Sequence, residues 1–158
     1  MKAQNIAMFV FSIVVCELAG VLGSIFTFPA LPVWYAALQK PDFAPGGNII
    51  GPVWIALYFL MGVSLYLIIL KNKDDKIVNS ALSLFAIQLS LNVLWSVIFF
   101  GLRSPGYALI EILFLWLSIF LTAYTFYKID RKAAYLLVPY LLWVSFAAVL
   151  NYQIWMLN

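Results

Sequence analysis

Amide, hydroxyl and indole side chains recur at helical spacing in three apolar stretches of the sequence. Gln88, Asn92 and Ser96 follow one another at i, i+4 and i+8, with Trp95 and Phe99 beside them. This spacing places side chains on one face of a helix. Aromatic faces around a few converging polar groups are what a site for a flat, mostly apolar ligand requires. Two further stretches carry similar stripes: Trp54, Tyr58 and Gly62 in one, and Tyr140, Trp143, Ala147 and Asn151 in the other.

Interhelical hydrogen bonding is the alternative use of these polar side chains. Inside a membrane such a bond is worth about 0.6 kcal/mol on average, and either use fits any one residue taken alone. Three stripes together favour a binding surface, on which rings stack against the ligand while Asn92, Ser96 or Gln88 fixes its orientation.

The composition excludes several kinds of chemical site. The sequence has no histidine, so Ser-His-Asp catalysis, imidazole-bound zinc and His-ligated haem are excluded. Cys16 is the only cysteine and is expected to be a small apolar filler. No phosphate-binding glycine motif occurs. We predict no metal site, no tightly bound cofactor and no nucleic-acid partner.

The elements that carry the stripes are expected to lie in a bilayer. Of the 158 residues, 66% are hydrophobic and 9% charged, too little polar surface for a soluble monomer. A crossing helix needs about 20 apolar residues. We predict an all-α, five-transmembrane-helix bundle forming one integral membrane domain, 1–158, with membrane lipid as a partner and spans at 3–28, 51–70, 77–101, 105–127 and 133–155.

The connections between the spans differ in length. Residues 71–76, 103–105 and 128–132 predict short turns, with Ser104 as N-cap and Pro105 at the first helical position. Residues 29–50 predict a long loop rich in proline and glycine, with a helical turn near 34–39. Loops of that length in compact folds are often lids or binding loops.

Lysine and arginine predict the orientation. Two of the nine basic residues, Lys40 and Arg103, fall on one side of a five-span chain, and seven on the other. Because cytoplasmic loops carry the basic excess, we expect an N-terminus inside and a C-terminus outside a prokaryotic plasma membrane. The seven are Lys2, Lys71, Lys73, Lys76, Lys128, Arg131 and Lys132.

Glu17 and Glu111 are the only acidic residues within the spans. In a functional role, each would bind a cation, an amine or a proton. In a purely structural role, Glu17 would pair with a neighbouring helix or stay protonated, and Glu111 would lie close enough to a helix end to reach water. Gly20 and Gly23 predict close helix packing rather than ligand contact. Two tryptophans are expected to face lipid or the interface, Trp116 and Trp155.

Three segments resemble motifs of the translocator protein family, also called the tryptophan-rich sensory protein or peripheral benzodiazepine receptor family. Residues 34–41 (WYAALQKP), followed by Pro45 and Trp54, resemble its first-loop motif. Residues 92–96 (NVLWS) resemble its third-helix motif. Residues 139–147 (PYLLWVSFA), with the later LNY and Trp155, resemble its fifth-helix motif.

The resemblance implies a five-helix bundle, commonly a homodimer, that binds porphyrins such as protoporphyrin IX and drug-like isoquinoline or benzodiazepine ligands beneath the first loop. It implies a role as a tetrapyrrole sensor or carrier. By motif match, nine residues would line the pocket: Tyr35, Trp54, Tyr58, Asn92, Trp95, Ser96, Trp143, Phe146 and Ala147.

The sequence departs from the family pattern in two places. Phe43 and Pro45-Gly46 stand where the family usually has Trp and Pro-Pro, which predicts a looser lid. In animal members a proposed cholesterol motif ends in a basic residue after the tyrosine that matches Tyr152. No Lys or Arg follows Tyr152 here, which argues against a cholesterol role and for a microbial member.

Two other functions stay open beside binding. Light- and oxygen-dependent porphyrin breakdown would use Trp54 and Trp143 as electron donors, and no other catalytic residue is assigned. Transport of a small solute would need a continuous polar path bearing Glu17 and Glu111.

Overall fold

The chain folds into five long helices. The computed structural model describes residues 3–71 and 76–158. Two π-helical segments, η1 (Leu31–Tyr35) and η2 (Val97–Gly101), extend the first and third helices, and no strand occurs within the described ranges. All five helices are long and apolar enough to cross a membrane, which confirms the predicted bundle. They are α1 (Ala3–Ala30), α2 (Gly47–Ile69), α3 (Lys76–Ser96), α4 (Pro105–Ile129) and α5 (Arg131–Leu157).

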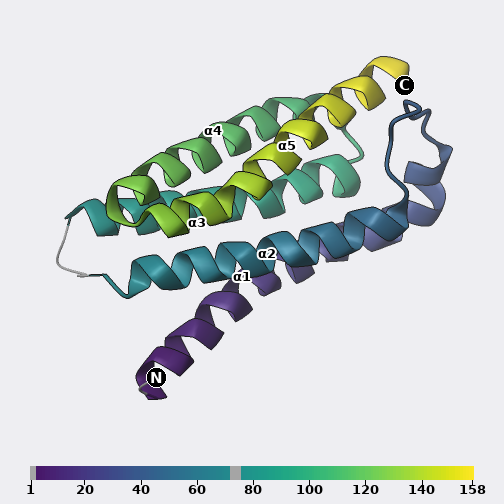
Figure 1. Ribbon diagram of the computed structural model, residues 1–158. Helices are drawn as coiled ribbons and strands as arrows, with labels where there is room; N and C mark the ends of the chain where they lie inside the picture. The colour runs from purple at the N-terminus through teal and green to yellow at the C-terminus, as the bar shows by residue number, and fades with distance from the viewer. Residues whose placement is uncertain (1–2, 72–75) are drawn as a thin grey trace.

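The helices form a closed ring of neighbours. The main contacts join α1 to α2, α2 to α5, α5 to α4, α4 to α3, and α3 back to α1. In Figure 1, α1 crosses the others obliquely, and the C-terminus lies at the same end as the connection between α1 and α2. That end of the ring holds the cavity described below.

The first connection is shorter than the predicted loop 29–50. Helical backbone continues from α1 through η1 to Ala37, and α2 begins at Gly47, so only residues 38–46 are irregular. Pro29 and Pro32 lack the N–H group of an ordinary helical hydrogen bond. The helix accommodates the two prolines by widening into a π-helical turn, in which the Ala36 N–H donates to the carbonyl of Leu31, five residues earlier.

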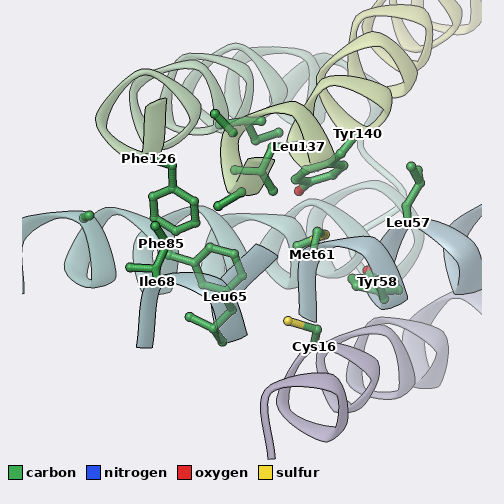
Figure 2. Close-up of a cluster of buried hydrophobic side chains, with 14 of the residues drawn as sticks. Cys16, Leu57, Tyr58, Met61, Leu65, Ile68, Phe85, Phe126, Leu137 and Tyr140 are labelled. Carbon is green, nitrogen blue, oxygen red and sulfur yellow. The ribbon is translucent and has the colours of Figure 1, made fainter. Parts of the chain in front are cut away.

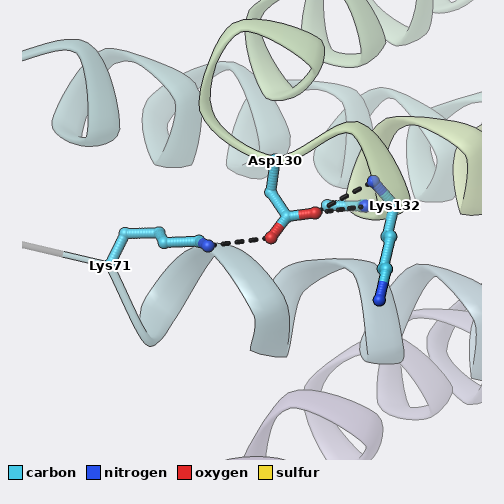
Figure 3. Close-up of polar contacts among 4 residues, drawn as sticks. Lys71, Asp130 and Lys132 are labelled. Carbon is cyan, nitrogen blue, oxygen red and sulfur yellow. Dashed lines mark hydrogen bonds and ion pairs between the residues drawn. The ribbon is translucent and has the colours of Figure 1, made fainter.

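The connection between α4 and α5 is also shorter than the predicted turn 128–132, because Asp130 starts α5 directly. Its Oδ1 accepts hydrogen bonds from the backbone N–H groups of Lys132, at 2.9 Å, and Ala133, at 3.3 Å (Figure 3). Its Oδ2 lies 2.8 Å from the Lys71 ammonium at the end of α2. Asp130 is thus both the N-cap of α5 and a link to α2.

The main core lies between the five helices, away from the irregular connection. Figure 2 shows Phe85 and Phe126 meeting across α3 and α4, with ring centroids 5.8 Å apart. Ile68 of α2 is fully buried beside them, and Met61 of the same helix is fully buried further along, between Tyr140 and Cys16. Cys16 is fully buried in the same cluster, as expected of an apolar filler.

Glycine permits the close approach of α1 to α2. A Cβ built on Gly62 would lie 2.7 Å from the Ile13 Cα, and one on Gly20 would lie 2.6 Å from the Tyr58 ring. A Cβ on Gly23 would lie 3.0 Å from the Ser96 Oγ of α3. The predicted packing role of Gly20 and Gly23 is confirmed.

The two predicted surface tryptophans differ. Trp155 is 48% exposed, as expected of a lipid-facing or interfacial side chain. Trp116 is half-buried, and its indole N–H donates to the Ser145 hydroxyl at 2.7 Å. The prediction for Trp116 was therefore wrong in part, because an indole N–H in the bilayer gains by bonding to the neighbouring helix.

Candidate functional site

A cavity of about 440 Å³ lies beneath the 38–46 connection. Its wall is built from α1, η1, α2, the joined α3 and η2, and α5. The volume falls within the range of small-molecule sites. All nine residues of the predicted pocket line this one cavity: Tyr35, Trp54, Tyr58, Asn92, Trp95, Ser96, Trp143, Phe146 and Ala147.

Stacked aromatic pairs form two sides of the wall. The rings of Trp54 and Tyr58, one turn apart on α2, lie 5.6 Å apart with their planes inclined by 29°. The rings of Trp95 and Phe99 lie 4.8 Å apart, inclined by 22°. Such pairs hold each other in place, so the wall presents ring surfaces in fixed positions.

The irregular connection covers one end of the cavity. Phe43 packs edge-on against the cavity residue Phe146, with ring centroids 6.1 Å apart, and Pro45 lines the cavity itself. Two contacts anchor this segment. The Asn158 side chain accepts from the backbone N–H of Gln39 and donates to its carbonyl, both at 3.0 Å. The Lys40 ammonium donates to the Tyr35 carbonyl at 2.9 Å.

Asn92 both lines the cavity and bonds to neighbouring helices. Its Oδ1 accepts a hydrogen bond from the Tyr58 hydroxyl of α2. Its Nδ2 donates to the Tyr140 hydroxyl of α5 at 2.8 Å. The interhelical hydrogen bonding of this amide is confirmed, and the bonds that join α2, α3 and α5 also hold Asn92 in the cavity wall, where contact with a ligand stays a prediction.

Asn151 repeats this arrangement nearer the covered end. The Trp95 indole N–H donates to its Oδ1 at 3.1 Å, and its Nδ2 donates to the Pro105 carbonyl at 2.7 Å. Asn151 lines the cavity, whereas Tyr140 of the same predicted stripe lies behind the wall. The α5 stripe is thus shared between cavity and core.

Several polar groups on the wall remain available to a ligand, and three of them are donors near the paired rings. Within the described chain, no hydrogen bond engages the Ser96 hydroxyl or the indole N–H groups of Trp54 and Trp143. All three can donate, so they suit a ligand that carries acceptor oxygens on an apolar body.

The two intramembrane acids lie in different surroundings. Glu17 of α1 lines the cavity, and no ion pair engages it within the described residues. Glu111 is only 6% exposed, and neither carboxyl oxygen has a hydrogen-bond partner in the described chain. The expectation that Glu111 reaches water was wrong, because the side chain faces the bundle on the same α4 face as Leu115 and Ser118.

Gln88 does not reach the cavity either. It is 1% exposed, and its amide oxygen and nitrogen both lack a partner among the described residues. It lies one turn before Asn92, deeper in the bundle, so the stripe continues past the end of the cavity. Of its three polar members, Asn92 and Ser96 are on the wall.

The sequence reasoning missed the contribution of α1. Gly20 and Gly23 were assigned to packing alone, yet they also line the cavity, together with Ser24 and Thr27. The signal was present, since these four small residues recur at i, i+3, i+4 and i+7. Small side chains on one helix face leave the space that the rings opposite enclose.

The chain is similar to proteins of a known family. The model of the TspO/MBR family matches residues 12–156. The Tryptophan-rich protein TspO of Archaeoglobus fulgidus is 42% identical over 98% of this chain and 99% of its own length. The Translocator protein of Bos taurus is 39% identical over 90% and 85%. The Tryptophan-rich sensory protein of Cereibacter sphaeroides is 34% identical over 79% and 77%.

Proposed function

Because the chain belongs to the TspO/MBR family, we propose that it binds porphyrins of the protoporphyrin IX type in the cavity and acts as a tetrapyrrole sensor or carrier. Flat isoquinoline or benzodiazepine-type molecules are the second class of ligand that the cavity would accept. One observation carries the proposal: eight aromatic and polar residues, together with Ala147, come from four parts of the chain and line a single cavity inside the bundle. The sensory and translocator names of the relatives are in keeping with this role.

The wall suits a flat ring with acceptor groups at its edge. Trp54 and Trp143 offer indole faces for stacking and unengaged N–H groups for hydrogen bonds. The Ser96 hydroxyl adds a third donor. Carboxylate oxygens on an apolar macrocycle would accept these hydrogen bonds, while the ring displaces water from the aromatic surfaces.

A metal-free porphyrin fits this wall better than haem. Haem iron takes an axial ligand such as His, Cys, Met or Tyr, and the sequence has no histidine. Cys16 lies in the core outside the cavity wall, and of the two tyrosines on the wall Tyr58 is engaged by Asn92, which leaves the Tyr35 hydroxyl as the one side chain of these four kinds that could ligate iron from the described part of the wall. We expect protoporphyrin IX to bind more tightly than haem in parallel tryptophan-quenching titrations. Equal or tighter haem binding would contradict this ligand preference.

The site itself is tested with a tryptophan pair. Trp54→Ala removes a stacked ring from the wall, whereas Trp116→Phe changes a tryptophan that lies outside it. We expect Trp54→Ala to weaken protoporphyrin IX binding about tenfold, since one stacked aromatic pair plus its buried area is worth more than 1 kcal/mol. Trp116→Phe should bind like wild type. Equal affinity in both variants would place the ligand elsewhere.

Light- and oxygen-dependent breakdown of bound porphyrin is the second candidate. In it an indole gives one electron to the excited porphyrin, the reduced porphyrin passes that electron to oxygen, and oxygen is the oxidant that breaks the ring. The indoles of Trp54 and Trp143 lie on the wall, as does that of Trp95, whose N–H is engaged by Asn151. If they act as electron donors to an excited porphyrin, Trp143→Phe should retain binding and lose the bleaching of porphyrin absorbance under light in air. Bleaching at the wild-type rate in this variant would remove Trp143 from the reaction.

Transport along a polar path ranks third. Such a path would bear both intramembrane acids, and Glu17 lines the cavity whereas Glu111 does not. Solute flux into proteoliposomes in the absence of porphyrin would favour transport over binding.

We also propose a prokaryotic plasma membrane with the N-terminus inside. Five described basic residues lie on the side assigned to the cytoplasm and two, Lys40 and Arg103, on the other side. Lys2 and Lys73 lie outside the described residues. The five are Lys71, Lys76, Lys128, Arg131 and Lys132. In a Cys16→Ala background, Asp42→Cys should react with a membrane-impermeant maleimide on whole cells, and Lys132→Cys should not. Labelling of position 132 alone would reverse the orientation.

A further inference from the structure

A second groove lies on the outside of the bundle at the covered end of the cavity. It has a volume of about 870 Å³ and is lined by η1 and Leu38 after it, the turn between η2 and α4, the first turns of α4 and the end of α5. Trp34 and Trp155 stand at its margins, and Arg103 and Ser104 form its upper part. None of the predicted pocket residues lines it, so it is separate from the cavity.

The upper part of the groove carries one unpaired positive charge. Within the described chain, no ion pair or hydrogen bond engages the Arg103 guanidinium or the Ser104 hydroxyl, and no Asp or Glu side chain lines the groove. Ser104 occupies the predicted N-cap position of α4, but its side chain makes no capping bond. An arginine beside a free hydroxyl suits an oxyanion, above all a phosphate, which a guanidinium binds through two parallel hydrogen bonds.

The backbone of Arg103 has an unfavourable conformation. Its φ is 54°, the only positive φ of a non-glycine residue in the described ranges. Glycine adopts this region without steric cost, whereas other residues do not. Arginine at this position therefore costs stability that a glycine would recover.

The lower part of the groove is apolar and continues onto the lipid-facing side of α4. Ile110 and Leu113 line it and are 56% and 60% exposed. From Pro105 to Leu113 the helix descends about 12 Å towards the middle of the bilayer. The tryptophans at the margins are the side chains that favour the boundary between headgroups and hydrocarbon.

We propose that this groove binds an anionic glycerophospholipid of the bilayer. Its phosphate lies on Arg103 and Ser104, its glycerol region lies beside Trp155, and one acyl chain follows Ile110 and Leu113. A zwitterionic lipid would bring an ammonium group to a groove that has no acidic side chain to meet it. The proposal does not depend on the ligand of the cavity.

The test compares two lipids with the same acyl chains. Dioleoyl phosphatidylglycerol and dioleoyl phosphatidylcholine are added to the purified protein in detergent, and the lipid retained is measured by native mass spectrometry. We expect wild type to retain the anionic lipid at least threefold better. Arg103→Gly should lose this preference, while its Tm should equal or exceed that of wild type because glycine suits the φ of 54°.

Two controls separate the groove from general effects of charge. Lys128→Gln removes a cation that lies over Tyr124 near the end of α4, away from the groove, and should keep the lipid preference. Soluble glycerol 3-phosphate at millimolar concentration should not displace the lipid. Preference retained in Arg103→Gly, equal loss in Lys128→Gln, or displacement by glycerol 3-phosphate would each overturn the proposal.

Discussion

Asn92 shows how a single buried amide joins three helices. It is 3% exposed, accepts from Tyr58 and donates to Tyr140. Sequence spacing placed Asn92 on a polar face but could not distinguish a hydrogen bond to a helix from a contact with a ligand. The structure shows the hydrogen bonds to the helices and places the amide where the wall of the cavity meets the core, so contact with a ligand stays a prediction.

The role of Tyr140 can be separated from that of the cavity. Tyr140→Phe removes the acceptor for the Asn92 Nδ2 and leaves the rest of the ring in place. We expect a loss of about 0.6 kcal/mol of unfolding free energy, and at most about 1.7 kcal/mol. Because Tyr140 lies outside the wall, porphyrin affinity should change less than twofold. Reversible unfolding in mixed micelles and a parallel porphyrin titration measure the two quantities. A large loss of affinity without a loss of stability would place Tyr140 in the site.

At the scale of the helices, the contact between α1 and α2 rests on Gly62. Gly62→Ala would bring a Cβ to 2.7 Å from the Ile13 Cα and 3.0 Å from the Ser12 carbonyl oxygen. Backbone cannot move aside as a flexible side chain can, so the helices must separate. We expect a loss of about 1–3 kcal/mol, as for other overpacked sites. Gly51→Ala on the same helix meets nothing within 4 Å and should keep or increase stability. Equal thermal shifts in the two variants would contradict the close approach.

The start of α5 is expected to respond to pH. The hydrogen bond from the Lys71 ammonium holds the pKa of the Asp130 carboxyl below its ordinary value. A carboxyl with a lowered folded-state pKa contributes stability that is present above its unfolded pKa of about 3.9 and is lost as pH falls through the folded-state value. Asp130→Asn keeps an N-capping oxygen but cannot titrate, so its unfolding free energy should change less with pH in the acid range than that of wild type. Because the pair is partly exposed, the difference near pH 7 should be below about 1 kcal/mol. An unchanged pH dependence of stability in the acid range in Asp130→Asn would show that Lys71 and Asp130 are not coupled.

At the scale of the whole molecule, hydropathy predicted the five spans and residue spacing predicted the aromatic and polar stripes, whereas the nine pocket residues, Tyr35 and Phe146 among them, were implied by the family resemblance. Hydropathy and spacing misplaced the ends of the connections, because the cap at Asp130 and the widened turn after Pro29 depend on hydrogen bonds that no hydropathy pattern records. The α1 side of the cavity was missed because glycines are read first as packing residues. The spacing of Glu111, Leu115 and Ser118 predicted an inward-facing side of α4, which is confirmed. Only the expected access of Glu111 to water was wrong, because closeness to a helix end does not expose a side chain that faces the bundle.

The homodimer implied by the resemblance stays a prediction, which the mass of the purified complex would test.

A change of cavity volume tests the central claim most directly. Ala147 lies on the wall, and Val149, two residues along α5, is 54% exposed on the outside. Ala147→Leu fills part of the cavity, whereas Val149→Leu adds one methylene group facing lipid. In titrations of purified protein with protoporphyrin IX, we predict that Ala147→Leu weakens binding about tenfold or more, since overpacking costs about 1–3 kcal/mol, and that Val149→Leu binds like wild type. Wild-type affinity in a folded Ala147→Leu variant would contradict the assignment of this cavity as the porphyrin site.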